Sequence, residues 1–211
     1  IYFNLTSPKI RKKKDYNFQL PYLYQFLIEG RKINNKNSKI IFDHLKKQFD
    51  KSDLIILTTQ YEPRDIIILD KLIKLILKER KRIIIFDNAL EQKVKTVNEF
   101  NRLDYYVFKN DNFPKKDELI EIEKKMYKDL ENKKNINEKI QLIANDNQIP
   151  LIKRSELFCD IKEKRCPAIT EKGYKIYWDY GHLTEKGAEF FAKKFENNKL
   201  FLGYFNHLIG N

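Results

Sequence analysis

The sequence has few cysteines and glycines and no long apolar segment. Among its 211 residues, two are cysteines, three are histidines and six are glycines. No apolar run approaches the roughly 20 residues that a membrane-spanning helix needs, so we expect none of this segment to cross a bilayer. Structural zinc takes four protein ligands, and two thiols without nearby histidines supply too few. We therefore expect no metal site.

The two cysteines, Cys159 and Cys166, are seven residues apart in a charged segment. A local disulfide that closes a short loop is the interpretation we favour, and it would indicate an oxidising, extracytoplasmic compartment. Two free cysteines in a cytosolic protein are the alternative.

The chain is strongly basic, with a net charge of +12 and a pI of about 9.4. Such a balance invites a nucleic-acid-binding interpretation. Yet most of the 42 basic residues are lysines spread along the chain, and no glycine-rich or aromatic-interleaved basic motif appears. A solvated lysine-rich surface explains the charge more simply. Attraction to anionic glycans or lipid head groups is equally compatible with it.

Two continuous apolar runs, at residues 53–59 and 82–87, predict buried parallel strands. The first run ends in polar residues, as strands do when they deliver side chains to a site. Between the runs, residues 63–80 are apolar around much of a helical circumference, and this order predicts a right-handed parallel crossover. We therefore predict an α/β fold, a three-layer sandwich with a mainly parallel sheet.

The remaining pattern predicts further elements along the whole chain. They are a strand at 1–5, helices at 16–30, 38–51 and 91–102, a short strand or connector at 105–108, helices at 116–130 and 135–145, and a strand at 149–153. No internal repeat or low-complexity linker divides them, so we expect a single domain over 1–211. The sequence opens at Ile1 inside a predicted strand and without Met, so we expect it to be part of a longer chain.

Near the C-terminal end, Asp179 precedes His182 by three residues in a turn that opens a helix. Such a turn can fold the carboxylate back onto the imidazole, which fixes the tautomer of the histidine and stabilises its protonated form. That arrangement is half of a catalytic triad. Many Asp-x-x-His pairs are only surface residues at a helix start, but here Thr184 is a good N-cap and Glu185 suits the positive end of the helix.

This segment resembles a known family. Most of the chain follows the family's order of elements, and the resemblance is sharp from about 150 to 188. It is to the SGNH-hydrolase-like domain fused to membrane-bound acyltransferase-3 proteins, which O-acetylate bacterial surface polysaccharides. The residues that carry it are Cys159, Cys166, Pro167, Tyr177, Asp179, His182, Leu183, Thr184, Gly187 and Ala188.

The resemblance implies a flavodoxin-like sheet and a serine nucleophile in a Gly-Asp-Ser motif just after the first strand. No Gly-Asp-Ser occurs in this sequence. Of its four serines only Ser7 follows a predicted strand, and it lacks the preceding Gly-Asp. We therefore expect the first strand and the nucleophile to lie upstream of Ile1, with Ser7 as the weaker candidate.

The other parts of the site are less defined by the sequence. Gln60 or Thr59, after the strand at 53–59, could donate a hydrogen bond to a developing oxyanion, or could simply be polar residues that end a strand. Trp178, the only tryptophan, could stack on a sugar ring beside His182. It could also anchor the turn by burying its ring, which is the interpretation we favour.

The function that the resemblance implies is serine acyl transfer to, or ester removal from, a polysaccharide at the periplasmic face of the inner membrane. His182 would be the general base and Asp179 would orient it. A membrane acyltransferase domain of the same protein would deliver the acetyl group, so this domain would bind no cofactor. The alternatives are an inactive glycan-binding or assembly module with the same fold, and a basic nucleic-acid-binding α/β domain.

Overall fold

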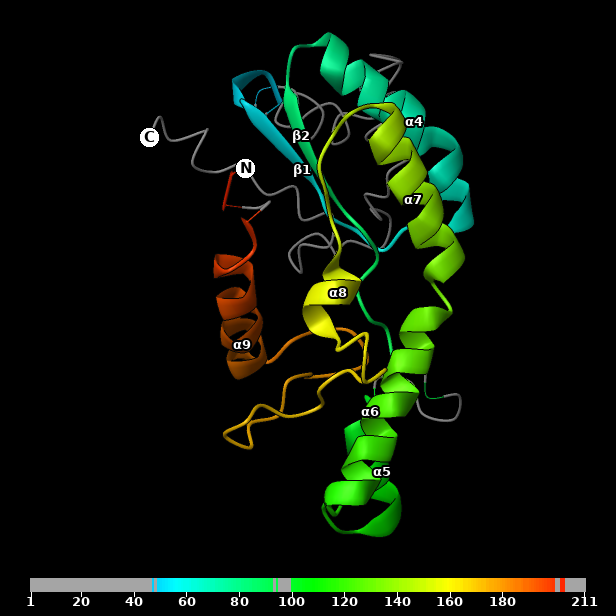
Figure 1. Ribbon diagram of the computed structural model, residues 1–211, viewed down its shortest axis with the longest axis vertical. Helices are drawn as coiled ribbons and strands as arrows, with labels where there is room; N and C mark the ends of the chain where they lie inside the picture. The colour runs from blue at the N-terminus through cyan, green and yellow to red at the C-terminus, as the bar shows by residue number, and fades with distance from the viewer. Residues whose placement is uncertain (1–46, 48, 93, 95–99, 200–201, 204–211) are drawn as a thin grey trace, which may run out of the picture. The chain divides into compact units, whose positions relative to one another are not determined.

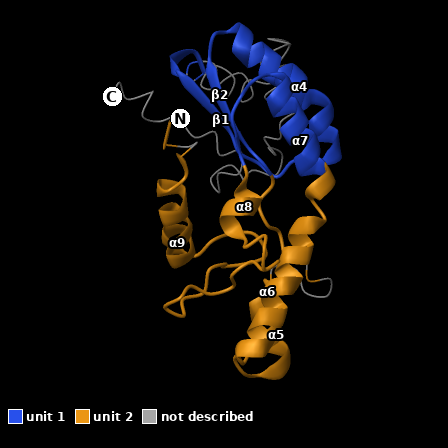
Figure 2. Cartoon of the chain, viewed as in Figure 1, with its two compact units in different colours: residues 1–87, 136–152 blue, residues 88–135, 153–211 orange. Residues whose placement is uncertain are grey.

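A computed structural model describes residues 47, 49–92, 94, 100–199 and 202–203. The chain forms two compact units, which Figure 2 shows in different colours. The described residues up to 87, together with 136–152, form unit 1. Residues 88–135 and the described residues from 153 onward form unit 2. Within the described residues, no helix is both long enough and apolar enough to span a membrane.

Unit 1 contains a three-stranded parallel sheet (Figure 1). Its strands are β1 (Leu54–Leu57), β2 (Arg82–Phe86) and β3 (Leu151–Ile152), in the order β1-β2-β3. Ile55 pairs with Ile83, and Ile85 pairs with Leu151. The strands are continuous apolar runs because side chains on both faces are buried. The predicted α/β fold with a parallel sheet is confirmed.

Two helices, α4 (Pro63–Lys78) and α7 (Lys134–Asp146), contribute the helical part of the unit 1 core. Pro63 occupies the first turn of α4, where its missing N–H costs nothing. The end of α7 is tied to α4 because Asn147 Nδ2 donates to Asp70 Oδ1 at 2.8 Å. The buried α4 side chains recur at helical spacing: Leu69, Leu72, Ile73 and Ile76.

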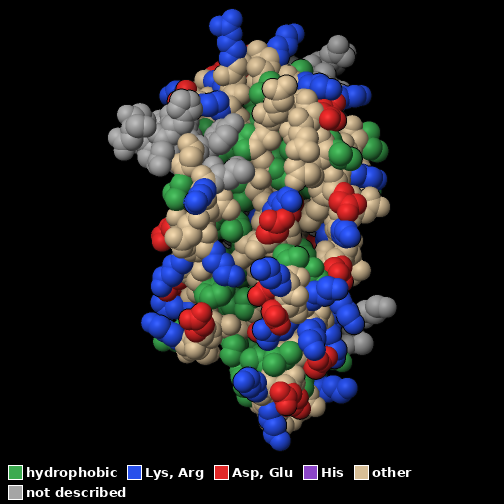
Figure 3. Space-filling view, viewed as in Figure 1, with side chains coloured by type: hydrophobic (Ala, Val, Ile, Leu, Met, Phe, Trp, Pro, Cys, Tyr) green, Lys and Arg blue, Asp and Glu red, His purple; other side chains and the backbone are tan. Residues whose placement is uncertain are grey.

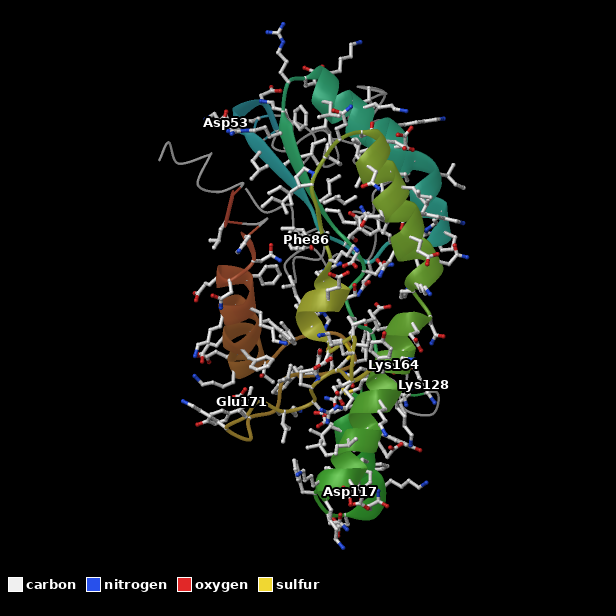
Figure 4. All side chains as sticks on the ribbon, viewed as in Figure 1. Asp53, Phe86, Asp117, Lys128, Lys164 and Glu171 are labelled. Carbon is white, nitrogen blue, oxygen red and sulfur yellow. A yellow bond between two sulfur atoms is a disulfide. The ribbon has the colours of Figure 1, made fainter. Side chains whose placement is uncertain are left out.

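In unit 2, helix α5 (Arg102–Asn110) packs beside α6 (Lys116–Glu131). The guanidinium of Arg102 forms an ion pair with Asp129, with one N–O distance of 2.6 Å. Helix α6 turns Ile122, Met126 and Leu130 into the core, while Asp117 in its first turn lies at the end remote from Lys128 (Figure 4).

The structure corrects two sequence predictions in this part of the chain. Residues 91–102 were expected to be helical, but the described residues before Arg102 are irregular. Residues 105–108, expected as a strand or connector, lie inside α5. The side chain of Asn101 starts the helix by accepting the N–H of Asp104 at 2.8 Å, and this cap overrides the β propensity of the aromatic residues that follow.

The C-terminal part of unit 2 includes the helices α8 (Arg154–Phe158) and α9 (Glu185–Glu196), with irregular loops between them. The rings of Phe158 in α8 and Phe191 in α9 stack with centroids 4.0 Å apart. Cys159 and Cys166 form the disulfide that the sequence suggested. The predicted strand at 1–5 and helix at 16–30 lie outside the described residues, as does most of the helix at 38–51.

Candidate active site

The turn from Asp179 to His182 brings the carboxylate and the imidazole together. Asp179 Oδ2 lies 2.7 Å from His182 Nδ1. The other oxygen, Oδ1, accepts the backbone N–H groups of Gly181 at 2.9 Å and of His182 at 2.8 Å. This is an Asx turn, in which the side chain of Asp holds its own backbone two and three residues on. The predicted juxtaposition of Asp179 and His182 is therefore present.

These hydrogen bonds set the charge of Asp179. Its side chain is 21% exposed, and this partial burial by itself would raise its pKa. The hydrogen bonds from the Gly181 N–H, the His182 N–H and the imidazole outweigh the burial, so the pKa of Asp179 lies below its usual value. The carboxylate is ionised at neutral pH and is placed to stabilise a protonated imidazole.

The imidazole itself is open to solvent. The His182 side chain is 50% exposed, and no described residue hydrogen-bonds to its Nε2 atom. The edge of the Tyr180 ring approaches it, with centroids 6.1 Å apart. Because Nδ1 is engaged by Asp179, Nε2 is the nitrogen that can exchange a proton with a reactant.

Helix α9 holds the turn at its N-terminus. Thr184 is the N-cap, as predicted, and its hydroxyl accepts the N–H of Gly187 at 2.9 Å. Across the turn, Trp178 N–H donates to His182 O at 2.7 Å, and Tyr177 forms a bridge with Leu183. The two ends of the turn are thus closed by backbone hydrogen bonds.

Residues far away in sequence support the segment that leads into this turn. Asn101 Nδ2 donates to Tyr177 O at 3.1 Å, and Gln92 N–H donates to Tyr180 O at 2.8 Å. Lys175 Nζ pairs with the carboxylate of Asp104 at 2.9 Å. The sequence carried no signal for these contacts, because the partners are separated by many tens of residues.

Trp178 is exposed rather than buried. Its residue exposure is 70%, and the Lys175 ammonium lies 5.6 Å from the centroid of its ring. The interpretation of Trp178 as a buried hydrophobic anchor of the turn is therefore wrong. An exposed indole four residues before His182 is free to contact a ligand, so the stacking role stays a prediction.

The candidate oxyanion residues belong to the other unit. Thr59 and Gln60 follow β1 in unit 1, where both are partly buried and take part in interactions, whereas Asp179 and His182 belong to unit 2. Their role stays a prediction. Ser7, the weaker candidate nucleophile, lies outside the described residues.

The disulfide loop is fixed on α6 close to a partly buried carboxylate, that of Glu123. Cys166 N–H donates to Glu123 O at 3.2 Å, and Ala168 N–H donates to Glu123 Oε1 at 3.1 Å. Burial raises the pKa of Glu123 above its usual value, although the hydrogen bond from the Ala168 N–H and the charge of Arg165 lower it.

Within the described residues, no cluster of His, Cys, Asp or Glu has the composition of a metal site.

An α/β fold with a parallel sheet and a carboxylate-oriented histidine at a helix start is the constellation of hydrolases and acyltransferases that work through a triad. Residues 24–197 match the family model described as the SGNH domain fused to AT3 domains. The chain belongs to this family, which confirms the resemblance seen around Asp179 and His182. No curated protein sequence matches the chain.

A similar solved structure is the periplasmic domain of the lipopolysaccharide acetyltransferase of Salmonella ser. Paratyphi A. The sequence identity is 16% and the TM-score is 0.47. The similarity covers 75% of this chain and 62% of the other, so this chain spans less than two thirds of that structure.

Proposed function

We propose that this chain is the serine acyl-transfer domain of a protein that O-acetylates, or deacetylates, a bacterial surface polysaccharide. The observation that carries the proposal is the 2.7 Å contact between Asp179 Oδ2 and His182 Nδ1 in a chain of the SGNH family fused to AT3 domains. An imidazole held in this way is suited to move a proton to and from hydroxyl groups.

The reaction has two acyl-transfer steps. First, His182 Nε2 takes the proton of a serine hydroxyl while the serine oxygen attacks the carbonyl of the acetyl donor, and the imidazolium then gives this proton to the leaving group. An acetyl-serine ester remains. Next, Nε2 takes the proton of a sugar hydroxyl, whose oxygen attacks the ester, and the proton returns to the serine. Asp179 stabilises the imidazolium in both steps. If water replaces the sugar, the same steps hydrolyse an ester.

The nucleophile in this proposal comes from a segment that precedes Ile1 in the protein. Its basis is the absence of Gly-Asp-Ser from the 211 residues. Ser7 is the alternative within this sequence. Gln60 or Thr59 would donate a hydrogen bond to the oxyanion that forms on the acetyl carbonyl.

The proposal places the domain at the periplasmic face of the inner membrane. The family's fusion to AT3 domains supports a membrane acyltransferase partner in the same protein. This partner would deliver the acetyl group, so the domain would need no cofactor of its own. The Cys159–Cys166 disulfide supports an oxidising compartment. It also argues against a cytosolic nucleic-acid-binding domain.

The surface charge gives no support to nucleic-acid binding either. On the face that Figure 3 shows, Lys and Arg side chains alternate with Asp and Glu side chains and form no continuous basic stripe. Proteins that track a nucleic-acid backbone concentrate their positive charge along one groove or helix. The charges on this face therefore do not favour nucleic acid as a partner.

We propose further that units 1 and 2 are parts of one SGNH-type domain. The chain passes from one unit to the other after residues 87, 135 and 152, and the family match at 24–197 includes residues of both.

A catalytically inactive glycan-binding module is the second candidate function, because no Gly-Asp-Ser is present.

The test is to replace His182 with Ala, and Asp179 with Asn, in the protein as its cells produce it. O-acetyl groups on the surface polysaccharide are then measured by NMR. We expect His182→Ala to abolish acetylation and Asp179→Asn to lower its rate by roughly 10²–10⁴-fold. Glu189→Gln, which breaks only an exposed ion pair on the same helix, is the matched control. Full acetylation with His182→Ala would overturn the proposal and leave the binding module.

A further inference from the structure

One groove of unit 2 is lined by two exposed aromatic side chains, Phe108 and Phe113. The groove has a volume of about 420 Å³. Trp178 is also exposed, and its ring centroid lies 5.6 Å from the ammonium of Lys175, which lines the groove. We call it the aromatic groove, and the lining residues that matter here are Leu103, Asp104, Val107, Phe108, Phe113 and Lys175.

This concentration of rings is not a general property of the surface. Apart from Tyr174, the other large exposed hydrophobic residues of the described chain are aliphatic and come from separate elements: Ile67, Leu142, Ile161 and Leu202. An aromatic ring left in water forgoes a large burial energy. Several such rings around one concavity indicate a surface that is covered when a ligand binds.

The groove also carries one fixed charged pair. Asp104 accepts hydrogen bonds from Lys175 Nζ at 2.9 and 3.1 Å and from Asn101 Nδ2 at 2.7 Å. Both members of the ion pair remain partly exposed, with side-chain exposures of 29% for Asp104 and 36% for Lys175. A ligand in the groove therefore meets aromatic faces together with one acceptor and one donor that still face water.

A sugar ring matches this combination. Its C–H faces are apolar and lie flat on aromatic rings, while its hydroxyls both donate and accept and so can bond to Asp104 and Lys175. An acyl chain would cover the same ion pair without replacing the hydrogen bonds to water that both groups lose, which is costly. The groove is thus suited to a carbohydrate rather than a lipid tail.

Lys175 connects the groove lining to the segment that leads to the Asp179–His182 turn. Lys175 Nζ lies 3.5 Å from Trp178 O and 5.6 Å from the centroid of the indole. Trp178 N–H donates in turn to His182 O. The 169–175 loop that forms one wall is closed by a bridge between Ile169 and Lys175, with Glu171 at its tip (Figure 4).

We propose that the aromatic groove binds the sugar residues of the acceptor polysaccharide that flank the acetylated one, and that Trp178 contacts the sugar on the side of the groove where Lys175 lies. This inference rests on the proposed function for the identity of the ligand. The binding site itself is specified by the groove and not by the Asp179–His182 pair.

The test measures binding without any acetyl donor, so its result does not depend on catalysis. The probe is the surface polysaccharide of the producing cells, de-O-acetylated with mild alkali, titrated calorimetrically into the purified protein as its cells produce it. We expect Phe108→Ala and Trp178→Ala each to weaken binding roughly tenfold. Both side chains are exposed, so neither variant should unfold. Leu142→Ala, an exposed residue of α7 in unit 1, is the control and should bind like the unaltered chain.

Binding also has an optical readout in the fluorescence that the unaltered protein shows and Trp178→Ala lacks. This emission, which comes from the indole of Trp178, should shift to shorter wavelength when the polysaccharide covers the ring. Absence of binding, or binding that Phe108→Ala and Trp178→Ala leave unchanged, would overturn the proposal that the groove binds the polysaccharide. The acetylation test with His182→Ala decides the proposed function separately. The two substitutions could instead weaken binding to vesicles of phosphatidylethanolamine and phosphatidylglycerol and leave binding to the polysaccharide unchanged. The groove would then be a lipid-binding surface, and the proposal would be overturned.

Discussion

Gly187 lies so close to the backbone of Ile176 that a Cβ at position 187 would stand 2.1 Å from the Ile176 carbonyl oxygen. Thr184 secures the same approach, since its N–H donates to Ile176 O at 2.9 Å and its hydroxyl to Lys175 O at 2.6 Å. Gly187 is in the first turn of α9, three residues after the N-cap Thr184. The missing side chain is what lets α9 begin here and hold the His182 turn.

Gly187→Ala should therefore destabilise the protein although Ala is the better helix former. The methyl group would force α9 away from Ile176, an overpacking that costs about 1–3 kcal/mol. The measurement is urea unfolding. Gly203→Ala is the control, because a Cβ there meets nothing within 4 Å, and it should be neutral or slightly stabilising. Equal stability of the two variants would show that α9 does not depend on this contact.

The pKa of Asp179 should lie below 3.8, its ordinary value. A lowered folded-state pKa means that the stabilisation is present above the unfolded pKa and is lost as the pH falls through the folded one. NMR titration of the carboxyl carbon measures it. His182→Ala removes the imidazole hydrogen bond and keeps both backbone ones, so the midpoint should move part of the way up.

Asp70 provides the internal control for this titration. Its pKa is lowered by hydrogen bonds from Asn147 and Lys74 in unit 1, which His182→Ala does not touch. A variant in which Asp179 titrates as in the unaltered protein would show that the imidazole does not bind the carboxylate in solution.

Removal of the disulfide should lower the stability of unit 2. Cys159 and Cys166 are both buried and belong to its core, so the double substitution to Ala loses the cross-link without burying a hydroxyl. Closure of so short a loop is worth about 2.5 kcal/mol in the chain-entropy model. Thermal unfolding of the double variant should show this loss, and dithiothreitol should destabilise the unaltered protein while leaving the variant unchanged. Insensitivity of both to the reductant would contradict the cross-link.

Removal of the hydroxyl should have different effects on the free energy of unfolding at two buried tyrosines, Tyr177 and Tyr61. The Tyr177 hydroxyl has no hydrogen-bond partner among the described residues, and burial raises its pKa far above the usual value. The Tyr61 hydroxyl donates to Leu57 O at 3.3 Å. Tyr177→Phe should keep or raise the free energy of unfolding by up to about 1 kcal/mol, whereas Tyr61→Phe should lower it by about 1 kcal/mol. Destabilisation by Tyr177→Phe would reveal a partner for its hydroxyl.

Several features follow from the sequence because their causes are local. The apolar runs that become β1 and β2 are buried on both faces. A continuous apolar run of this kind can be identified as a buried strand without knowing which strands lie beside it. The Asp179–His182 turn depends on hydrogen bonds that span two and three residues. Thr184 starts α9 through its own side chain. Each of these is fixed by the order of a few adjacent residues.

The start of α5 shows where such local reasoning fails. The aromatic run at 105–108 has strand propensity, but the cap at Asn101 and the contact of Arg102 with Asp129 stabilise a helix. Whether an N-cap outweighs the strand propensity of the residues that follow depends on the tertiary contacts of the helix. The residues that make these contacts are far away in the sequence.

The sequence by itself determined the fold class and the pairing of Asp179 with His182, and it favoured the disulfide over two free cysteines. Only the tertiary structure decided that Trp178 is exposed and that Lys175 meets Asp104, 71 residues earlier, at the edge of the aromatic groove. The physical reason is range: hydrogen bonds within a turn are set by neighbouring residues, whereas burial and long-range ion pairs depend on how distant segments pack in three dimensions.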